Sequence, residues 1–370
     1  MADQPKRINL ALQGGGSFGA FTWGALDRLL EDERLQIAAI SGTSAGAMNA
    51  VALMEGMSKQ GPAGARACLR RFWEGVAEAA EGRLLGWAQQ PLQTFLGSWG
   101  GSLNPFSYWT EVMARSFSPY DVNPLNYNPL QILLSKLIDF ETVRSCDQVL
   151  AFISATNVHT GRVRVFERSE LTADHIMASA CLPFMFQAVE IEGVPYWDGG
   201  YMGNPSLWPL FESSDSDDTV LIQINPIETN ETPHSAREIM DRVNEITFNA
   251  SLLRELRAVD FVNRLRDDGR LEDTGYRRVF IHMIHDHERI AFEGRSRLHP
   301  GRAFLEELFE RGRVVADHWL QENFDSLGQA SSVNLRKLFQ GEADALDGDR
   351  IEPQRPKRKL PPSKASGAER

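Results

Sequence analysis

Ser44 lies in a run of residue types that suits nucleophilic chemistry. It is the centre of Gly42-Thr43-Ser44-Ala45-Gly46, which follows the apolar residues 38–41 and precedes residues 45–54, rich in Ala, Met and Leu. This order predicts a strand, a sharp turn and a helix. A serine at the apex of such a turn exposes its hydroxyl, because flanking glycines let the backbone bend without Cβ clashes. The simpler alternative is that Ser44 only caps the helix.

A run of glycines, residues 13–19 (Gln-Gly-Gly-Gly-Ser-Phe-Gly), joins another predicted strand, residues 8–12, to a predicted helix, residues 20–30. Such a turn can direct N–H groups into a concave anion site. Gly14, Gly16 and Gly19 also match the dinucleotide fingerprint, which expects an acidic residue at the end of the second strand. That strand ends instead in Ser41 and the serine turn. The pattern therefore favours an oxyanion site beside a nucleophile over a nucleotide site.

Asp198 ends a third notable stretch. Residues 189–197 alternate around Glu192 and Gly193, which predicts a hairpin, and Gly199 and Gly200 follow Asp198. Taken alone, Asp-Gly-Gly is typical of a turn.

Together, the three runs resemble the pattern of the patatin-like phospholipases: a glycine-rich oxyanion loop, a Gly-x-Ser-x-Gly elbow, and Asp-Gly-Gly or Asp-Gly-Ala, in that order. Residues 178–184, with Phe186 and Val189, also look like the family's approach to its aspartate, and the resemblance covers about residues 8–210. The sequence departs from the family at Phe18, where a basic residue is common.

The resemblance implies an α/β fold, a three-layer α/β/α sandwich with a mainly parallel central sheet, here with a helical C-terminal extension. It implies that Ser44 is the nucleophile and Asp198 the proton acceptor, without a histidine. It assigns the oxyanion donors to Gly14, Gly15, Gly16, Ser17 and Ala45, and the elbow and turn glycines to Gly19, Gly42, Gly46, Gly199 and Gly200.

The implied activity is hydrolysis of fatty-acyl ester bonds in phospholipids or related lipids, with no cofactor and no metal. An aspartate with an ordinary pKa of about 3.9 is a weak base for a hydroxyl. The oxyanion donors and the close placement of the carboxylate must then supply much of the rate. The alternatives are a catalytically silent lipid- or nucleotide-binding protein, or an α/β-hydrolase-type esterase. Phospholipase, neutral lipase and thioesterase differ in pocket shape, which no motif specifies.

An α/β-hydrolase would need a downstream histidine. His282, His285 and His287 are clustered, and the spacing of the last two would also suit a metal site on one strand face. Against the α/β-hydrolase, Ser44 follows only the second predicted strand. The preferred interpretation of the cluster is a strand leaving the core for a polar loop.

The composition of the chain limits the class of protein and its possible partners. The chain has 370 residues, 42% hydrophobic and 24% charged, and a net charge of -11, which argues against general nucleic-acid binding. The polar start and the short apolar run predict a cytoplasmic protein. The cysteines are scattered, so we expect them reduced and mostly buried. They are Cys68, Cys146 and Cys181.

The domain prediction is a catalytic domain over residues 1–225, a mainly helical extension over 226–340 and a disordered charged tail over 341–370. Apolar residues within 84–108 could line an acyl groove or pack as core. A long helix starting near Thr232 and Pro233, with apolar positions between 239 and 259, is expected to pack on the domain. The basic part of the tail could touch an anionic membrane, but a solubilising tail is favoured.

Overall fold

The computed structural model describes residues 4–81, 118–229, 232–271, 274–286 and 301–341. Its centre is an eight-stranded sheet in the order β5-β6-β3-β2-β1-β7-β8, with β4 also paired to β3. The strands are β1 (Lys6–Leu12), β2 (Leu35–Gly42), β3 (Leu150–Asn157), β4 (Val163–Glu167), β5 (Val189–Ile191), β6 (Val194–Asp198), β7 (Asp218–Ile222) and β8 (Phe280–Ile284).

Most of the sheet is parallel, as predicted. β3, β2, β1, β7 and β8 run in the same direction, whereas β4, β5 and β6 are antiparallel to their neighbours. The parallel strands are almost continuously apolar because helices cover both of their faces. Their carboxyl ends meet at one edge of the sheet, where the glycine run and the serine turn emerge.

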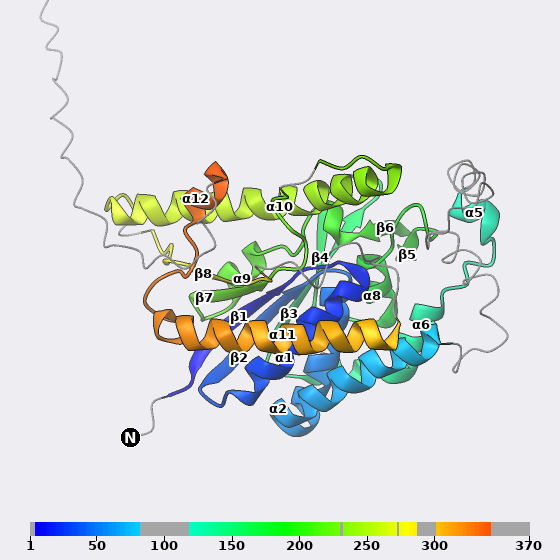
Figure 1. Ribbon diagram of the computed structural model, residues 1–370, viewed down its shortest axis with the longest axis horizontal. Helices are drawn as coiled ribbons and strands as arrows, with labels where there is room; N and C mark the ends of the chain where they lie inside the picture. The colour runs from blue at the N-terminus through cyan, green and yellow to red at the C-terminus, as the bar shows by residue number, and fades with distance from the viewer. Residues whose placement is uncertain (1–3, 82–117, 230–231, 272–273, 287–300, 342–370) are drawn as a thin grey trace, which may run out of the picture.

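Helices form a layer on each face of the sheet (Figure 1). α1 (Gly19–Glu31), α2 (Ala45–Ala80) and α11 (Arg302–Asn323) cover one face, and α9 (Trp208–Ser213), α10 (Ala236–Asp267) and α12 (Leu335–Gln340) cover the other. Side chains of β1 alternate between the two layers: Leu10 and Leu12 join the core under α1, and Ala11 joins the core under α10. The predicted three-layer α/β/α sandwich is confirmed.

Shorter elements complete the described chain. They are η1 (Gly16–Phe18), α5 (Pro119–Val122), α6 (Pro129–Leu137), α7 (Phe140–Ser145), η2 (Arg168–Glu170), α8 (Ala173–Ser179), η3 (Gly199–Tyr201) and η4 (Phe324–Ser326). α2 is broken at Gln60 and Gly61, just before Pro62. No helix in the described part of the chain is long and apolar enough to cross a membrane.

β2 and β6 lie end to end along one edge of β3. β4 occupies the other edge of β3 from residue 152 to residue 156, so both β2 and β6 must pair on the free edge. Gly42 at the end of β2 is opposite Ile153, and Asp198 at the end of β6 is opposite Ala155. Since β6 is antiparallel to β3, the carboxyl ends of β2 and β6 face each other. The register thus brings the aspartate to the serine turn.

α10 differs from the sequence-based expectation. It begins at Ala236, later than the predicted start near Thr232 and Pro233, because Ser235 caps it and Glu238 bonds back to the Ser235 N–H at 3.0 Å. Leu256 is completely buried, but Val243 and Ile246 are 51% and 55% exposed. The expectation that the whole apolar face packs on the domain is therefore wrong for the first half of the helix. Ile239 and Met240 are also exposed there.

The region after residue 225 contributes a strand of the central sheet as well as helices. β8 extends the sheet beyond β7, and α11 packs along α1 in the layer opposite α10 (Figure 1). α11 begins at Arg302 and ends at Asn323, within the extension predicted to be mainly helical. The stretch 84–108 and the tail lie outside the described residues.

Candidate active site

Ser44 lies at a sharp turn between β2 and α2. Its backbone has φ 53° and ψ -119°, in the left-handed region that costs a residue with a side chain about 1–3 kcal/mol. The turn closes tightly on the end of β1: a Cβ on Gly46 would lie 2.1 Å from the carbonyl oxygen of Leu12. Only glycine allows this approach, which explains the glycine two residues after the serine. The predicted elbow is present.

The glycine loop after β1 packs directly against this elbow. A Cβ on Gly14 would lie 2.8 Å from the Cβ of Ser44. Gly15 precedes η1, which begins at Gly16 and includes Ser17, and Gly19 begins α1 beside Ala45. The glycine loop and Ser44 are therefore in contact.

Asp198 lies at the end of β6, with its side chain almost completely buried. The carboxylate accepts the N–H of Gly200 at 2.7 Å and interacts with the hydroxyl of Ser44. Burial raises the pKa of Asp198 to about 7, although both hydrogen bonds act in the opposite direction. Gly199 and Gly200, at the start of η3, fit closely against Ser154 and Phe248. The structure brings the predicted serine and aspartate together.

The N–H groups around Ser44 differ in availability. The N–H of Gly14 donates to Asn204 Oδ1 at 2.7 Å and is therefore already engaged. Among the described residues, no acceptor is found for the N–H groups of Gly15, Gly16, Ser17 and Ala45. Of the five predicted oxyanion donors, only Gly14 thus has a hydrogen-bond acceptor for its N–H among the described residues.

Two hydroxyl groups that the sequence did not single out fix the elbow. Ser179, at the end of α8, accepts the Ser44 N–H at 2.9 Å and donates to the carbonyl of Ser154 at 2.7 Å. Thr43 donates to the carbonyl of Gly203 at 2.7 Å. The two bonds of Ser179 join the elbow to β3, and the bond of Thr43 joins it to the loop after Asp198. Isolated serines and threonines carry no sequence signal for such roles.

Asn49, on α2, ties the elbow to α1. Its Nδ2 donates to the carbonyls of Gly19 and Ala45, at 3.0 and 3.1 Å, and its Oδ1 accepts the indole N–H of Trp73 at 2.9 Å. This fully buried amide thus connects the elbow with the start of α1.

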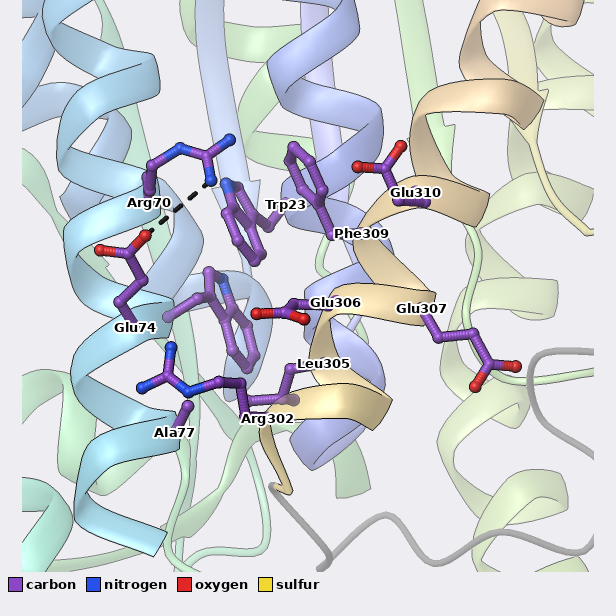
Figure 2. Close-up of a pocket in the computed structure, with 11 residues that line it drawn as sticks. Trp23, Arg70, Glu74, Ala77, Arg302, Leu305, Glu306, Glu307, Phe309 and Glu310 are labelled. Carbon is purple, nitrogen blue, oxygen red and sulfur yellow. Dashed lines mark ion pairs between the residues drawn. The ribbon is translucent and has the colours of Figure 1, made fainter. Parts of the chain in front are cut away.

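A groove of about 370 Å³ lies between α1, α2 and α11 (Figure 2). Arg70 lies near Glu74 there, with 3.9 Å between the charged atoms, and Arg70 also stacks over Trp23. Neither Ser44 nor Asp198 lines the groove, so it is separate from the elbow. Its lining residues are Trp23, Arg70, Trp73, Glu74, Ala77, Arg302, Leu305, Glu306, Glu307, Phe309 and Glu310.

His282 lies away from this site. His282, on β8, is fully buried and bonds through Nε2 to Asp218 Oδ1 at 2.9 Å, with Ser332 beside its Nδ1. β8 is separated from β2 by β1 and β7. His285 follows the strand, in agreement with the preferred interpretation, and His287 lies outside the described residues.

Phe18 and the cysteines are buried. Phe18 packs edge-on against Phe304 of α11, with ring centroids 6.1 Å apart, where the family commonly has a basic residue. All three cysteines are free and buried, as expected. Burial raises the pKa of the Cys181 thiol to about 12, so this neighbour of Asp198 stays protonated and is no rival nucleophile.

The crystal structure of VipD from Legionella pneumophila is a structural match with a TM-score of 0.37 and 14% identity, covering 86% of this chain and 67% of that chain. No curated protein sequence matches. The model of the family described as patatin-like phospholipase matches residues 10–211, more than half of the chain. The chain therefore belongs to the patatin-like phospholipase family.

Proposed function

We propose that this protein is a serine acyl hydrolase that cleaves fatty-acyl ester bonds of phospholipids or related lipids with Ser44 and Asp198. Family membership supports lipid acyl hydrolysis in general. The observation that supports the finer proposal is the contact of the Ser44 hydroxyl, at a strained elbow, with the buried carboxylate of Asp198.

In the first half-reaction, Ser44 Oγ attacks the acyl carbonyl carbon while its proton passes to Asp198. The N–H groups of Gly15, Gly16, Ser17 and Ala45 supply the donors for the tetrahedral oxyanion. When this intermediate collapses, the alcohol leaves with the proton from Asp198 and the acyl group stays on Ser44.

In the second half-reaction, water attacks the acyl ester of Ser44 and gives a proton to Asp198. The tetrahedral intermediate then releases the fatty acid, and Ser44 recovers its proton. A pKa of about 7 makes Asp198 a better base than an ordinary aspartate, while leaving it largely ionised in mildly alkaline solution. No imidazole is needed in either half-reaction.

Nucleotide binding has less support at the glycine loop. A pyrophosphate would have to approach the backbone at the glycines. The side of Gly14 that such a ligand would need is occupied, since a Cβ there would lie 2.8 Å from Ser44 Cβ and 3.3 Å from Asn204 Oδ1. Thermal stabilisation of the protein by a nucleotide would contradict this argument.

Covalent labelling tests the proposal most directly. A fluorophosphonate probe should label the wild-type protein, should not label Ser44→Ala, and should label Asp198→Ala far more slowly. The rate of ester hydrolysis, measured over a series of acyl chain lengths, should likewise be highest in the wild type, far lower in Asp198→Ala and absent in Ser44→Ala. Ser145→Ala, which removes an exposed hydroxyl on α7, is the matched control and should label normally. Labelling that persists in folded Ser44→Ala would place the nucleophile elsewhere.

A further inference from the structure

We propose that two buried asparagines, Asn204 and Asn225, are positioning residues that hold the glycine loop in the orientation in which it donates to the oxyanion. This inference rests on the function proposed above and concerns the same site. With Gln13 and Asn249, the two asparagines form a cluster that we call the amide clamp.

Two residues of the amide clamp form hydrogen bonds to the backbone of Gly14. Asn204 Oδ1 accepts the N–H of Gly14 at 2.7 Å, and Asn225 Nδ2 donates to the carbonyl of Gly14 at 2.6 Å. Both polar groups of this residue are therefore held by side chains. Asn204 lies on the loop that follows Asp198, so one loop carries both the base and half of the clamp.

The bond from Asn225 has a direct consequence for Gly15. In a trans peptide the carbonyl and the N–H point in opposite directions. Holding the Gly14 carbonyl therefore fixes the direction of the Gly15 N–H, one of the four donors proposed above for the oxyanion. Peptides between glycines rotate easily because no Cβ restricts them. An oxyanion donor must be oriented before the reaction, and the clamp supplies that restraint.

The clamp is itself tightly held. Gln13 Oε1 accepts the N–H groups of Ile224 and Asn225, each at 2.9 Å. Gln13 Nε2 donates to Asn249 Oδ1 on α10 at 3.2 Å, and Asn249 Nδ2 donates to the carbonyl of Pro226 at 3.0 Å. Gln13, Asn204 and Asn225 are fully buried and Asn249 is 2% exposed. Buried amides are costly unless they are hydrogen-bonded, so the bonds of Gln13, Asn225 and Asn249 favour a single arrangement of these three side chains. Asn204 Nδ2 finds no partner among the described residues, so the Asn204 side chain is held through its Oδ1.

Uncharged amides suit this position. They can orient a peptide without placing a charge close to the developing oxyanion and Asp198 in a poorly solvated site. A carboxylate in place of Asn225 would set oxygen against the Gly14 carbonyl oxygen, and an apolar side chain would leave that carbonyl free to turn.

The test compares Asn225→Ala and Asn204→Ala with Asn9→Ala. Asn9 is an equally buried asparagine on β1, but it bonds to Ser214 and Ser216 instead of the glycine loop. With a soluble short-chain ester, each clamp variant should lose about 10- to 100-fold in kcat with little change in KM, because the oriented donor acts in the transition state. Asn9→Ala should retain kcat within about twofold. Thermal melts verify that each variant is folded.

Hydrogen–deuterium exchange provides a readout without catalysis. Residues 12–20 should exchange faster in the clamp variants than in the wild type and in Asn9→Ala. Equal exchange, an unchanged kcat, an effect on KM alone, or an equal loss in Asn9→Ala would overturn the inference. A folded wild type that hydrolyses no ester would refute the proposed function, and the exchange experiment would still decide whether the clamp holds the loop.

Discussion

At the scale of single residues, Asp198 combines a common side chain with an unusual environment. It is 1% exposed, so water cannot stabilise its negative charge, and the hydrogen bonds from Gly200 and Ser44 compensate in part. The resulting pKa of about 7 lies close to neutral pH, where a general base is most effective. The residue type alone would suggest a carboxylate that is fully ionised at pH 5.

The pH dependence of hydrolysis follows from this pKa. Because the proposed mechanism needs the ionised form of Asp198, kcat/KM should rise with pH through an apparent pKa near 7 and then level off. At pH 5 it should be roughly one hundredth of the plateau. The measurement is kcat/KM for a soluble ester from pH 5 to pH 9.

A histidine could titrate in the same range, so the profile needs a control. His282→Gln should keep the transition near pH 7 and most of the activity, because His282 lies on β8 and bonds to Asp218. If the transition disappeared in that variant while the protein stayed folded, an imidazole would be the base and the role of Asp198 would be wrong.

At the scale of secondary-structure elements, α10 shows one helix in two environments. The half that includes Leu252 and Leu256 packs on the sheet, and the half that includes Val243 and Ile246 has its apolar face exposed. The spacing of the apolar residues is similar in both halves. What differs is whether the sheet lies beneath them.

Two matched truncations along α10 test this difference. Leu256→Ala should lower the free energy of unfolding by about 2–5 kcal/mol, because it leaves a cavity in the core. Val243→Ala should change it by less than about 0.5 kcal/mol, since the side chain is already half in water. Chemical denaturation of both variants provides the measurement. Similar losses in the two variants would mean that the first half of α10 is also packed.

The sequence predicted the parts of the site that depend on local geometry. The elbow, the glycine loop and the Asp198 hairpin each have a pattern within a few residues, because the turn demands glycine and the flanking strands demand apolar side chains. Ser179, Asn204 and Asn225 escaped prediction since their partners are far away in the chain. An isolated amide or hydroxyl looks the same whether it holds a loop or faces water.

At the scale of the whole molecule, the helical layer formed by α1, α2 and α11 combines segments that are far apart in the sequence. Arg66 of α2 bonds to Asp27 and Glu31 of α1, at 2.8 and 2.6 Å, and Arg313 of α11 pairs with the same two carboxylates. α11 also covers the apolar side of α1, where Phe309 lies 4.1 Å from Trp23 between ring centroids. The family resemblance ended near residue 210, and no motif indicated that α11 would pack there.

Removing everything after residue 225 should therefore prevent folding. The loss of α11 would expose the core side of α1 and leave Asp27 buried without Arg313, and the loss of β8 would open the edge of β7. Circular dichroism and a thermal melt would reveal the missing cooperative transition. A protein shortened after residue 341, which keeps every described element, is the control and should melt normally. A folded, active 1–225 fragment would show that the catalytic region is independent.

Because β2 and β6 lie end to end on one edge of β3, their pairing with β3 sets the distance between Ser44 and Asp198. Gly42 and Asp198 stand two β3 residues apart, at Ile153 and Ala155, and each residue of a strand spans about 3.3 Å. A slip of one position would carry the carboxylate out of reach of the serine hydroxyl. The separation of Asp198 and Ser44 is thus set by sheet hydrogen bonds and does not depend on the length of chain between them. Insertions between α2 and β3 should therefore leave the distance between Ser44 and Asp198 unchanged.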